Sequence, residues 1–216
     1  MRESERPAQR RKDAPLAAGQ EDGLSVGSVE PIAAKPLLAV RIATVDSVDI
    51  AELAAVAGRT FPLACPPSVT PANIAAFVDA NLSDERFAEY LADPRRLILT
   101  ASQDGRIVGY AMLIRGVGDD PHVQRAVPVR PAVELSKIYV LPDKHGSGVS
   151  TALMDAALAA AVDWGAHCMW LGVNQKNLRA QRFYSKCGFT INGTRTFQLG
   201  TRTESDYVMV RQFAAA

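Results

Sequence analysis

The chain has 216 residues, of which 48% are hydrophobic, and these values fit one soluble globular domain with a sizeable core. Its formal net charge of +1 provides no general field that would draw the protein onto nucleic acid or an anionic membrane. No window approaches the roughly 18 apolar residues that span a bilayer, and the N-terminus lacks an apolar signal core. We therefore expect a protein with no nucleic-acid partner and no membrane partner.

The three cysteines, Cys65, Cys168 and Cys187, form neither an even set for disulfides nor a paired metal-ligand spacing. This pattern favours reduced thiols over disulfides, and it gives no sign of a metal site. We therefore expect a cytoplasmic protein without a bound metal.

Residues 1–34 show no apolar period and drift through Gly, Ser, Ala and Pro after a basic cluster at Arg10, Arg11 and Lys12. A segment of this composition buries too little surface to offset the entropy lost on ordering it. The basic cluster is typical of a solvated tail, although it would also suit contact with an acidic partner. We predict a disordered tail over residues 1–34 and one folded domain over residues 35–216.

The front of this domain predicts one strand and three helices. Residues 37–42 have the apolar character of a short strand, and Asp46 is a plausible N-cap for a helix that ends at Gly58. Thr70, followed by proline, marks the start of a second helix, and Ser83 marks the start of a third.

A β-hairpin and a long loop follow these helices. Residues 97–101 and 107–114 are apolar segments on either side of Asp104-Gly105, a dipeptide that favours an antiparallel hairpin. Residues 116–131 contain three prolines and are predicted to form a mobile loop.

The back of the domain predicts a strand at residues 133–141, a helix from Val149 to Gly165 and a strand at residues 168–173. A strand, helix and strand in this order favour parallel pairing of the two strands. A further helix begins at Asn177. Two last strands are expected at about residues 189–199 and 206–212. The chain is therefore an α/β protein, antiparallel in its front half and parallel at its centre.

Residues 140–150, Val-Leu-Pro-Asp-Lys-His-Gly-Ser-Gly-Val-Ser, lead from a strand directly into a helix. Such a turn presents unpaired backbone amides at the positive end of the helix dipole. Gly146 and Gly148 allow an anion to approach the backbone, and Lys144 and His145 add positive or donor groups. The turn predicts an anion site, although small glycine turns also arise for purely geometric reasons.

Two nucleotide-binding patterns do not fit this turn. A P-loop needs lysine and then serine or threonine after its last glycine, whereas Val149 follows Gly148. The dinucleotide pattern Gly-x-Gly-x-x-Gly would have Thr151 at its last position. The turn therefore favours a different phosphate ligand.

His145-Gly146-Ser147-Gly148-Val149-Ser150 resembles the signature Gln/Arg-x-x-Gly-x-Gly/Ala of the GNAT superfamily of N-acetyltransferases, with His145 and Ser150 as departures. A second segment at residues 174–189 is similar to the superfamily's Asn-x-x-Ala-x-x-Phe-Tyr-x-x-x-Gly-Phe. Within the superfamily, residues 134–141, residues 170–174 and the ending from Leu199 to Tyr207 look most like bacterial polyamine N-acetyltransferases.

The resemblance implies the GNAT fold, a mixed and mostly antiparallel sheet with a parallel, splayed central strand pair and helices on both faces. It also implies acetyl-CoA as co-substrate and a small-molecule amine, such as a polyamine, as acceptor. Dimers are common in the superfamily, so a homodimer is a candidate assembly. The residues implied in coenzyme binding are Ile138, Tyr139, Val140, Lys144, His145, Gly146, Ser147, Gly148, Val149, Ser150, Asn174, Asn177, Ala180 and Tyr184.

Two residues are candidates for acid and base catalysis. Tyr184 matches the tyrosine that protonates the coenzyme A thiolate in many relatives, whereas its alternative role is packing beside Phe183. Glu134 is the candidate base for a protonated amine, because a regular strand would place it on the same side as Ile138 and Val140. A solvated carboxylate at the strand edge explains Glu134 about as well, and a bulge would break the alternation.

The acceptor site has weaker signals. Glu204 and Asp206 could attract a polycation, but a polar hairpin loop explains them equally well. Cys187 would suit a covalent acetyl-cysteine route, whereas direct transfer is the family's usual one. His122 and His167 have no partners at informative spacing.

Two other functions remain open beside acetylation of a small amine. One is acetylation of proteins or peptides. The other is a coenzyme A-binding regulatory domain with weak catalysis, which His145 and Ser150 would suit.

Overall fold

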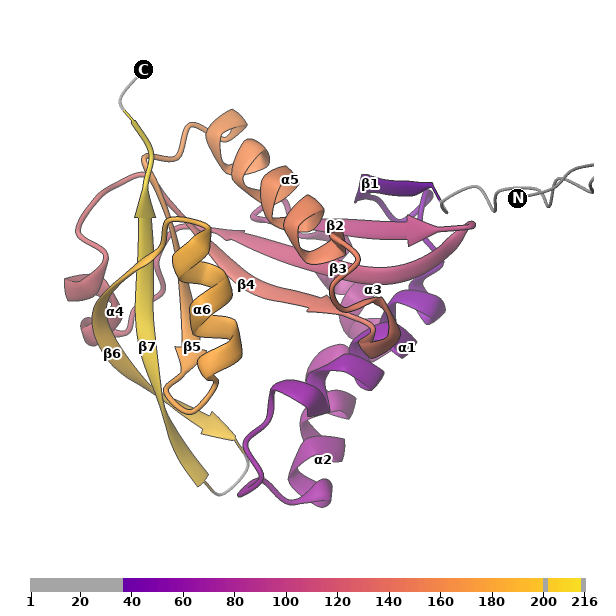
Figure 1. Ribbon diagram of the computed structural model, residues 1–216, viewed down its shortest axis with the longest axis horizontal. Coiled ribbons are helices and arrows are strands. Elements are labelled where there is room, and N and C mark those ends of the chain that lie inside the picture. Colours follow the sequence, from indigo (N-terminus) through magenta and orange to yellow (C-terminus); the bar gives the residue numbers. More distant parts are fainter. Residues whose placement is uncertain (1–36, 200–201, 215–216) are drawn as a thin grey trace, which may run out of the picture. The chain divides into compact units, whose positions relative to one another are not determined.

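The computed structural model describes residues 37–199 and 202–214. In this part of the chain, seven strands form one sheet in the order β1-β2-β3-β4-β5-β7-β6 (Figure 1). The β4–β5 pair is parallel and the other neighbours are antiparallel. The strands are β1 Leu38–Ala43, β2 Arg96–Gln103, β3 Arg106–Arg115, β4 Ala132–Val140, β5 Cys168–Asn174, β6 Thr190–Leu199 and β7 Arg202–Gln212. The predicted α/β fold with a parallel central pair is confirmed, whereas the predicted tail lies outside the described residues.

Helices cover both faces of the sheet. The longest described helix, α5, packs against β2, β3 and β4, and α1 and α3 pack against β2 and β3 from the other face (Figure 1). None of the described helices has the length and apolar character that crossing a bilayer requires. The helices are α1 Ile50–Thr60, α2 Pro71–Leu82, α3 Asp84–Ala92, α4 Pro121–Ala126, α5 Val149–Asp163 and α6 Leu178–Lys186, with 3₁₀ turns η1 Phe61–Ala64 and η2 Pro142–Lys144.

Side-chain caps fix where several helices begin. The Thr70 hydroxyl accepts from an N–H in the first turn of α2, and Ser83 does the same for α3, as predicted. The prediction for α1 was wrong at both ends. Asp49, not Asp46, caps it, because the Asp49 side chain accepts from the Glu52 amide. The helix also continues past Gly58 and ends at Thr60.

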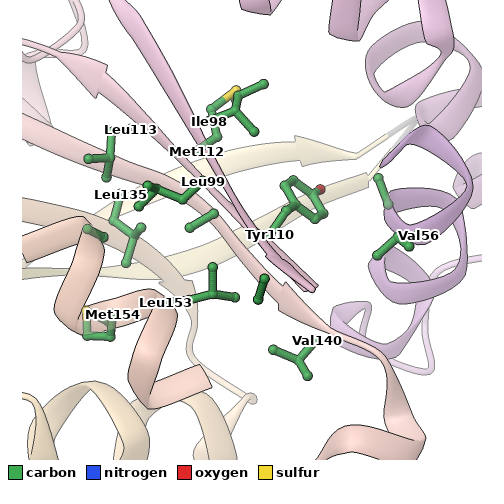
Figure 2. Packing of buried hydrophobic residues seen from close by; sticks show 14 of the residues in the cluster. Val56, Ile98, Leu99, Tyr110, Met112, Leu113, Leu135, Val140, Leu153 and Met154 are labelled. Atoms are coloured by element: carbon green, nitrogen blue, oxygen red, sulfur yellow. The ribbon is translucent and has the colours of Figure 1, made fainter. Parts of the chain in front are cut away.

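The main core lies on both faces of β3. Tyr110 points toward the α1 and α3 face, where its ring centroid is 5.7 Å from that of Phe87. Leu113 points to the opposite face, toward Leu153 of α5 (Figure 2). These side chains have no exposed surface, and complete burial of one aliphatic side chain contributes about 1.5–3 kcal/mol.

The segment at residues 116–131 corrects an expectation, because it contains α4 instead of being a mobile loop throughout. Val123 and Val127 are almost completely buried, in a second cluster that includes Trp170 of β5. The Trp170 indole N–H donates to the Gly116 carbonyl at 3.0 Å. These apolar contacts and this hydrogen bond hold the segment against β5 and β7.

Candidate active site

The parallel strands β4 and β5 pair only at their beginnings, from Ala132 to Glu134 on β4. Beyond Glu134 the register pairs β4 with β3 alone, so one edge of β4 through Val140 has no described neighbouring strand. Unpaired backbone N–H and C=O groups need hydrogen-bond partners. The expected splay is therefore present, and it leaves an edge to which an extended ligand can bind as an added strand.

A cavity of about 730 Å³ opens at this separation, a size within the range of about 300–1,000 Å³ that is usual for small-molecule sites. It brings together most of the residues that the sequence singled out. Those that line it are Glu134, Ile138, Tyr139, Val140, His145, Gly146, Gly148, Ser150, Asn174, Asn177, Ala180 and Tyr184.

The glycine turn forms one end of the cavity. Gly146 has φ 82° and Gly148 has φ 91°, values in the left-handed region that strain other residues. A Cβ built at either position would meet nothing within 4 Å, so the backbone here is open to a ligand. Because no side chain caps α5, its first N–H groups also remain available to an anion.

Polar side chains of the turn fold back onto the main chain. The His145 Nε2 atom lies 3.0 Å from the Val140 carbonyl oxygen and donates to it in the tautomer protonated there. The Ser147 hydroxyl donates to the Lys144 carbonyl at 2.6 Å. Both contacts fix the conformation of the turn.

Three residues implied in coenzyme binding do not line the cavity. Lys144 pairs with Asp143 at 3.7 Å and borders a different hollow beside α1. Ser147 lies at the turn's exposed side, and the Val149 side chain is completely buried in the core. Val149 can therefore offer a ligand only its backbone.

The start of α6 forms the wall opposite β4. Asn177 caps this helix as predicted, and its Oδ1 accepts from the Ala180 amide at 3.1 Å. One turn further, Tyr184 reaches the cavity, with its ring 5.6 Å from Phe183 and 6.1 Å from Phe189. Burial, with a smaller effect from Cys187, raises the pKa of the Tyr184 hydroxyl, so this group is protonated at neutral pH.

A β-bulge at Ser136 overturns the alternation expected for Glu134. Leu113 pairs with Leu135 and Met112 pairs with Lys137, which leaves Ser136 without a partner. Glu134 therefore shares the α1 and α3 face with Lys137 and Tyr139, not the face of Ile138 and Val140.

Burial dominates the electrostatics of Glu134 and Lys137. It raises the pKa of Glu134, against the opposing charges of Arg195, Lys137 and Arg96. It lowers the pKa of Lys137 to about 8, and the nearby Glu134 opposes this effect. The carboxylate of Glu134 is therefore a stronger base than usual. The ammonium of Lys137 beside it loses its proton more easily than usual.

The acidic residues of β7 are buried and paired, which corrects the view of them as parts of a polar loop. The Glu204 carboxylate accepts from Ser68 at 3.2 Å, from Asn174 at 3.4 Å and from Lys176 at 3.4 Å. Asp206 lies 3.6 Å from the Arg195 guanidinium. Asn174, implied in coenzyme binding, has its amide nitrogen on Glu204 and its oxygen on the Lys176 N–H.

Sequence reasoning missed Lys137, Arg195 and the segment around η1 as parts of the cavity. The bulge that turns Lys137 inward has no signature in the sequence. Arg195 lies on a strand that carries no motif. Its position opposite Asp206 follows only from the register of the β6–β7 hairpin.

One cysteine, Cys65, lines the cavity, and burial raises the pKa of its thiol to about 11, so its thiolate is disfavoured at neutral pH. Cys65, Cys168 and Cys187 are free thiols, and Cys187 is not among the lining residues. Burial raises the pKa of Cys187, so its reactive thiolate is disfavoured. Within residues 37–199 and 202–214, no three His, Cys, Asp or Glu side chains are grouped to hold a metal ion.

Comparison with known proteins identifies the family of the chain. A model of the acetyltransferase (GNAT) family matches residues 66–189. An uncharacterized N-acetyltransferase from Mycobacterium tuberculosis is 66% identical over 164 residues, which cover 76% of this chain and 97% of the relative.

Solved structures share the fold. The PaiA N-acetyltransferase from Thermoplasma acidophilum, in complex with coenzyme A, matches with a TM-score of 0.64 and 18% identity, over 82% of this chain and 99% of that one. The ribosomal-protein-S18-alanine N-acetyltransferase from Escherichia coli matches with a TM-score of 0.58 and 19% identity, over 83% and 96%. With the family model and the mycobacterial relative, these similarities show that the chain belongs to the acetyltransferase (GNAT) family, as an acetyl-CoA-dependent N-acetyltransferase.

Proposed function

We propose that the protein transfers the acetyl group of acetyl-CoA to a primary amine of a small molecule, by direct attack in a ternary complex. The observation that carries this proposal is the cavity itself. It joins an uncapped helix N-terminus, a free strand edge, a buried tyrosine and a buried carboxylate.

The donor end of the site is the glycine turn with the free edge of β4. The amides that follow Gly146 and Gly148 bind the pyrophosphate, and Asn177, whose Oδ1 caps α6, contributes its amide nitrogen. The backbone of residues 138–140 pairs with the pantetheine arm, and an amide at or near Val140 polarises the thioester carbonyl. Acetyl-CoA supplies the carbonyl carbon that the amine attacks.

Glu134 and Tyr184 handle the protons. Glu134 takes a proton from the acceptor ammonium, directly or through water, and so frees the nitrogen lone pair. As the new C–N bond forms and the C–S bond breaks, Tyr184 donates its hydroxyl proton to the departing thiolate. Burial supports both roles, because it raises the basicity of Glu134 and keeps Tyr184 protonated.

The acceptor class and the catalytic role have three further candidates. A polyamine stays a prediction from the sequence, and the pairing of Glu204 and Asp206 with Lys176 and Arg195 weakens the charge argument for it. A peptide acceptor is favoured by the name of the Escherichia coli structural relative. A regulatory domain that binds coenzyme A with weak catalysis is the third candidate, motivated by His145 and Ser150, which depart from the family signature.

A thiol-release assay with acetyl-CoA and a panel of polyamines, amino acids, aminoglycosides and peptides tests the proposal. We expect saturable release with at least one small amine and an acetylated product by mass spectrometry. Turnover on peptides alone would favour the second function. Calorimetric binding of acetyl-CoA without thiol release on any amine would contradict the proposal and favour a regulatory domain.

A further inference from the structure

Arg195 reaches from β6 into the cavity at the end away from the glycine turn. Its guanidinium lies 3.9 Å from the Glu134 carboxylate and 3.6 Å from the Asp206 carboxylate. Its central carbon is 5.5 Å from the centre of the Trp170 ring. A Cβ at Gly172 would lie 2.6 Å from that carbon, so the glycine of β5 makes room for the guanidinium.

The hydrogen-bonding capacity of this guanidinium is not used up. Its buried Nε atom faces the Asp206 carboxylate at 3.6 Å, beyond hydrogen-bond distance, and has no hydrogen-bond partner among the described residues. Its Nη1 atom lies 3.9 Å from the Glu134 carboxylate, also beyond that distance. An arginine carries five N–H donors in a planar fork that matches a carboxylate. A carboxylate of a ligand in the cavity would give this guanidinium a hydrogen-bonding partner that neither ion pair supplies.

Charges at this end of the cavity give no surplus that would draw in a polycation. Each carboxylate faces a cation of the chain itself. The lining carries three carboxylates, Glu134, Glu204 and Asp206, and three cations, Lys137, Arg179 and Arg195, and Lys176 pairs with Glu204 from outside the lining. An acceptor that carries its own positive and negative groups therefore fits this end better than a chain of amines.

An apolar wall closes the cavity on the side of η1 and α2. Phe61 and Phe77 stack with ring centroids 4.3 Å apart, and both line the cavity. Leu63, also in the lining, leaves 56% of its surface exposed. An apolar substituent of the acceptor would cover this surface and remove it from water.

We propose that the acceptor is an α-amino carboxylate with an apolar side chain, whose carboxylate binds the Arg195 guanidinium in a bidentate manner. The proposal rests on the proposed function and names its substrate class. In an α-amino acid the nitrogen is only two bonds from the carboxylate carbon. A carboxylate held by Arg195 therefore brings the α-amine to Glu134, which lies beside the same guanidinium.

Thiol release with matched acceptors tests this contact in the full-length protein. Leucine, leucinamide and 3-methylbutylamine share the same apolar group, but only leucine carries the carboxylate. We expect kcat/KM for leucine to exceed that for leucinamide by at least about tenfold, with most of the difference in KM. Equal values for leucine and leucinamide, or a preference for spermidine or an N-terminal peptide, would overturn the inference while leaving acetyl transfer intact.

Arg195→Gln and Arg195→Lys separate recognition from a structural role. We expect Arg195→Gln to remove the preference for leucine over leucinamide, and Arg195→Lys, which keeps the charge without the fork, to restore part of it. Arg179→Gln, at another arginine of the lining, should keep the preference. An equal loss with both acceptors in Arg195→Gln would overturn the carboxylate contact, and if this variant does not fold, the wild-type comparison decides. Absence of release with every amine would refute the proposed function as well.

Discussion

Tyr184 and Tyr139 each bring a phenol group to the lining of the cavity, one from α6 and the other from β4. Burial is the largest effect on both groups, and it raises both pKa values. Both hydroxyls are therefore protonated at neutral pH, so protonation alone does not choose the acid. The motif match favours Tyr184, which follows the helix cap Asn177 by two turns.

Tyr184→Phe tests that choice. The ring keeps its contacts with Phe183 and Phe189, so we expect unchanged folding and a fall in kcat of about 10²-fold or more, the usual share of a general acid. Tyr139→Phe is the matched control and should change kcat much less. Steady-state kinetics across pH provide the measurement, and unchanged turnover of Tyr184→Phe at every pH would remove this residue as the acid.

Glu134, as the proposed base, should give the pH profile its acid limb. A base must be ionised, so kcat/KM should fall as pH decreases through the raised pKa of Glu134, above the value of about 4.3 for an ordinary glutamate. Glu134→Gln should abolish this limb and lower kcat/KM by about 10²-fold or more.

Lys137→Met provides the contrast. This substitution removes the Lys137 cation, which lowers the Glu134 pKa, so the acid limb should move to higher pH. The plateau value of kcat/KM above the limb should persist. Profiles of the wild type and the two variants separate the roles of Glu134 and Lys137. An acid limb that survives in Glu134→Gln and vanishes in Lys137→Met would assign the base to Lys137 instead.

At the scale of elements, the start of α5 depends on a glycine. A side chain at position 148, where φ is 91°, costs about 1–2 kcal/mol in backbone strain and would occupy the space of the proposed phosphate. We expect Gly148→Ala to raise the Kd for acetyl-CoA by at least about tenfold, roughly 1.4 kcal/mol.

Gly165→Ala is the matched control, because Gly165 follows the other end of α5 with φ 73° and the same open surroundings. It should lower the melting temperature by a similar amount and leave the Kd unchanged. Calorimetry and thermal unfolding measure the two effects. Equal Kd values for both variants would contradict phosphate binding at the turn.

The same elements show what a sequence can predict. Local signals found the hairpin at Asp104, the caps Thr70 and Asn177, and the strand, turn and helix around residues 140–150, because each depends on neighbours within a few residues. The bulge at Ser136 depends on how β4 pairs with β3, two segments separated by residues 116–131. The sequence therefore predicted the strand β4 correctly but assigned Glu134 to the wrong face of it.

At the scale of the molecule, Glu204 joins three distant segments. Its carboxylate accepts from Ser68 between α1 and α2, from Asn174 at the end of β5 and from Lys176 just after β5. Long-range contacts of this kind, like those of Arg195 and α4, have no local signal in the sequence. This is why the sequence predicted lining residues at the glycine turn and the start of α6, and missed Arg195 and Lys137.

Glu204→Ala should lower the free energy of unfolding by about 1–3 kcal/mol, because it removes a buried carboxylate that accepts from the half-buried Ser68 and Asn174 and from the exposed Lys176. The exposed Glu89→Ala, in an ion pair with Arg86 on α3, is the control and should change little. Burial raises the Glu204 pKa, but the three donors outweigh it and lower the pKa overall. The stabilisation is therefore present above the unfolded pKa and disappears as pH falls through the folded one. Denaturation at pH 7 and under acid conditions checks this, and a variant as stable as the wild type would refute the link.

A crystal structure of the protein with coenzyme A tests the central claim most directly. The account predicts the pyrophosphate at the amides after Gly146 and Gly148, the pantetheine along the free edge of β4, and the thiol beside the Tyr184 hydroxyl. A coenzyme bound outside the separation of β4 and β5, or a thiol directed away from Tyr184 and Glu134, would contradict it.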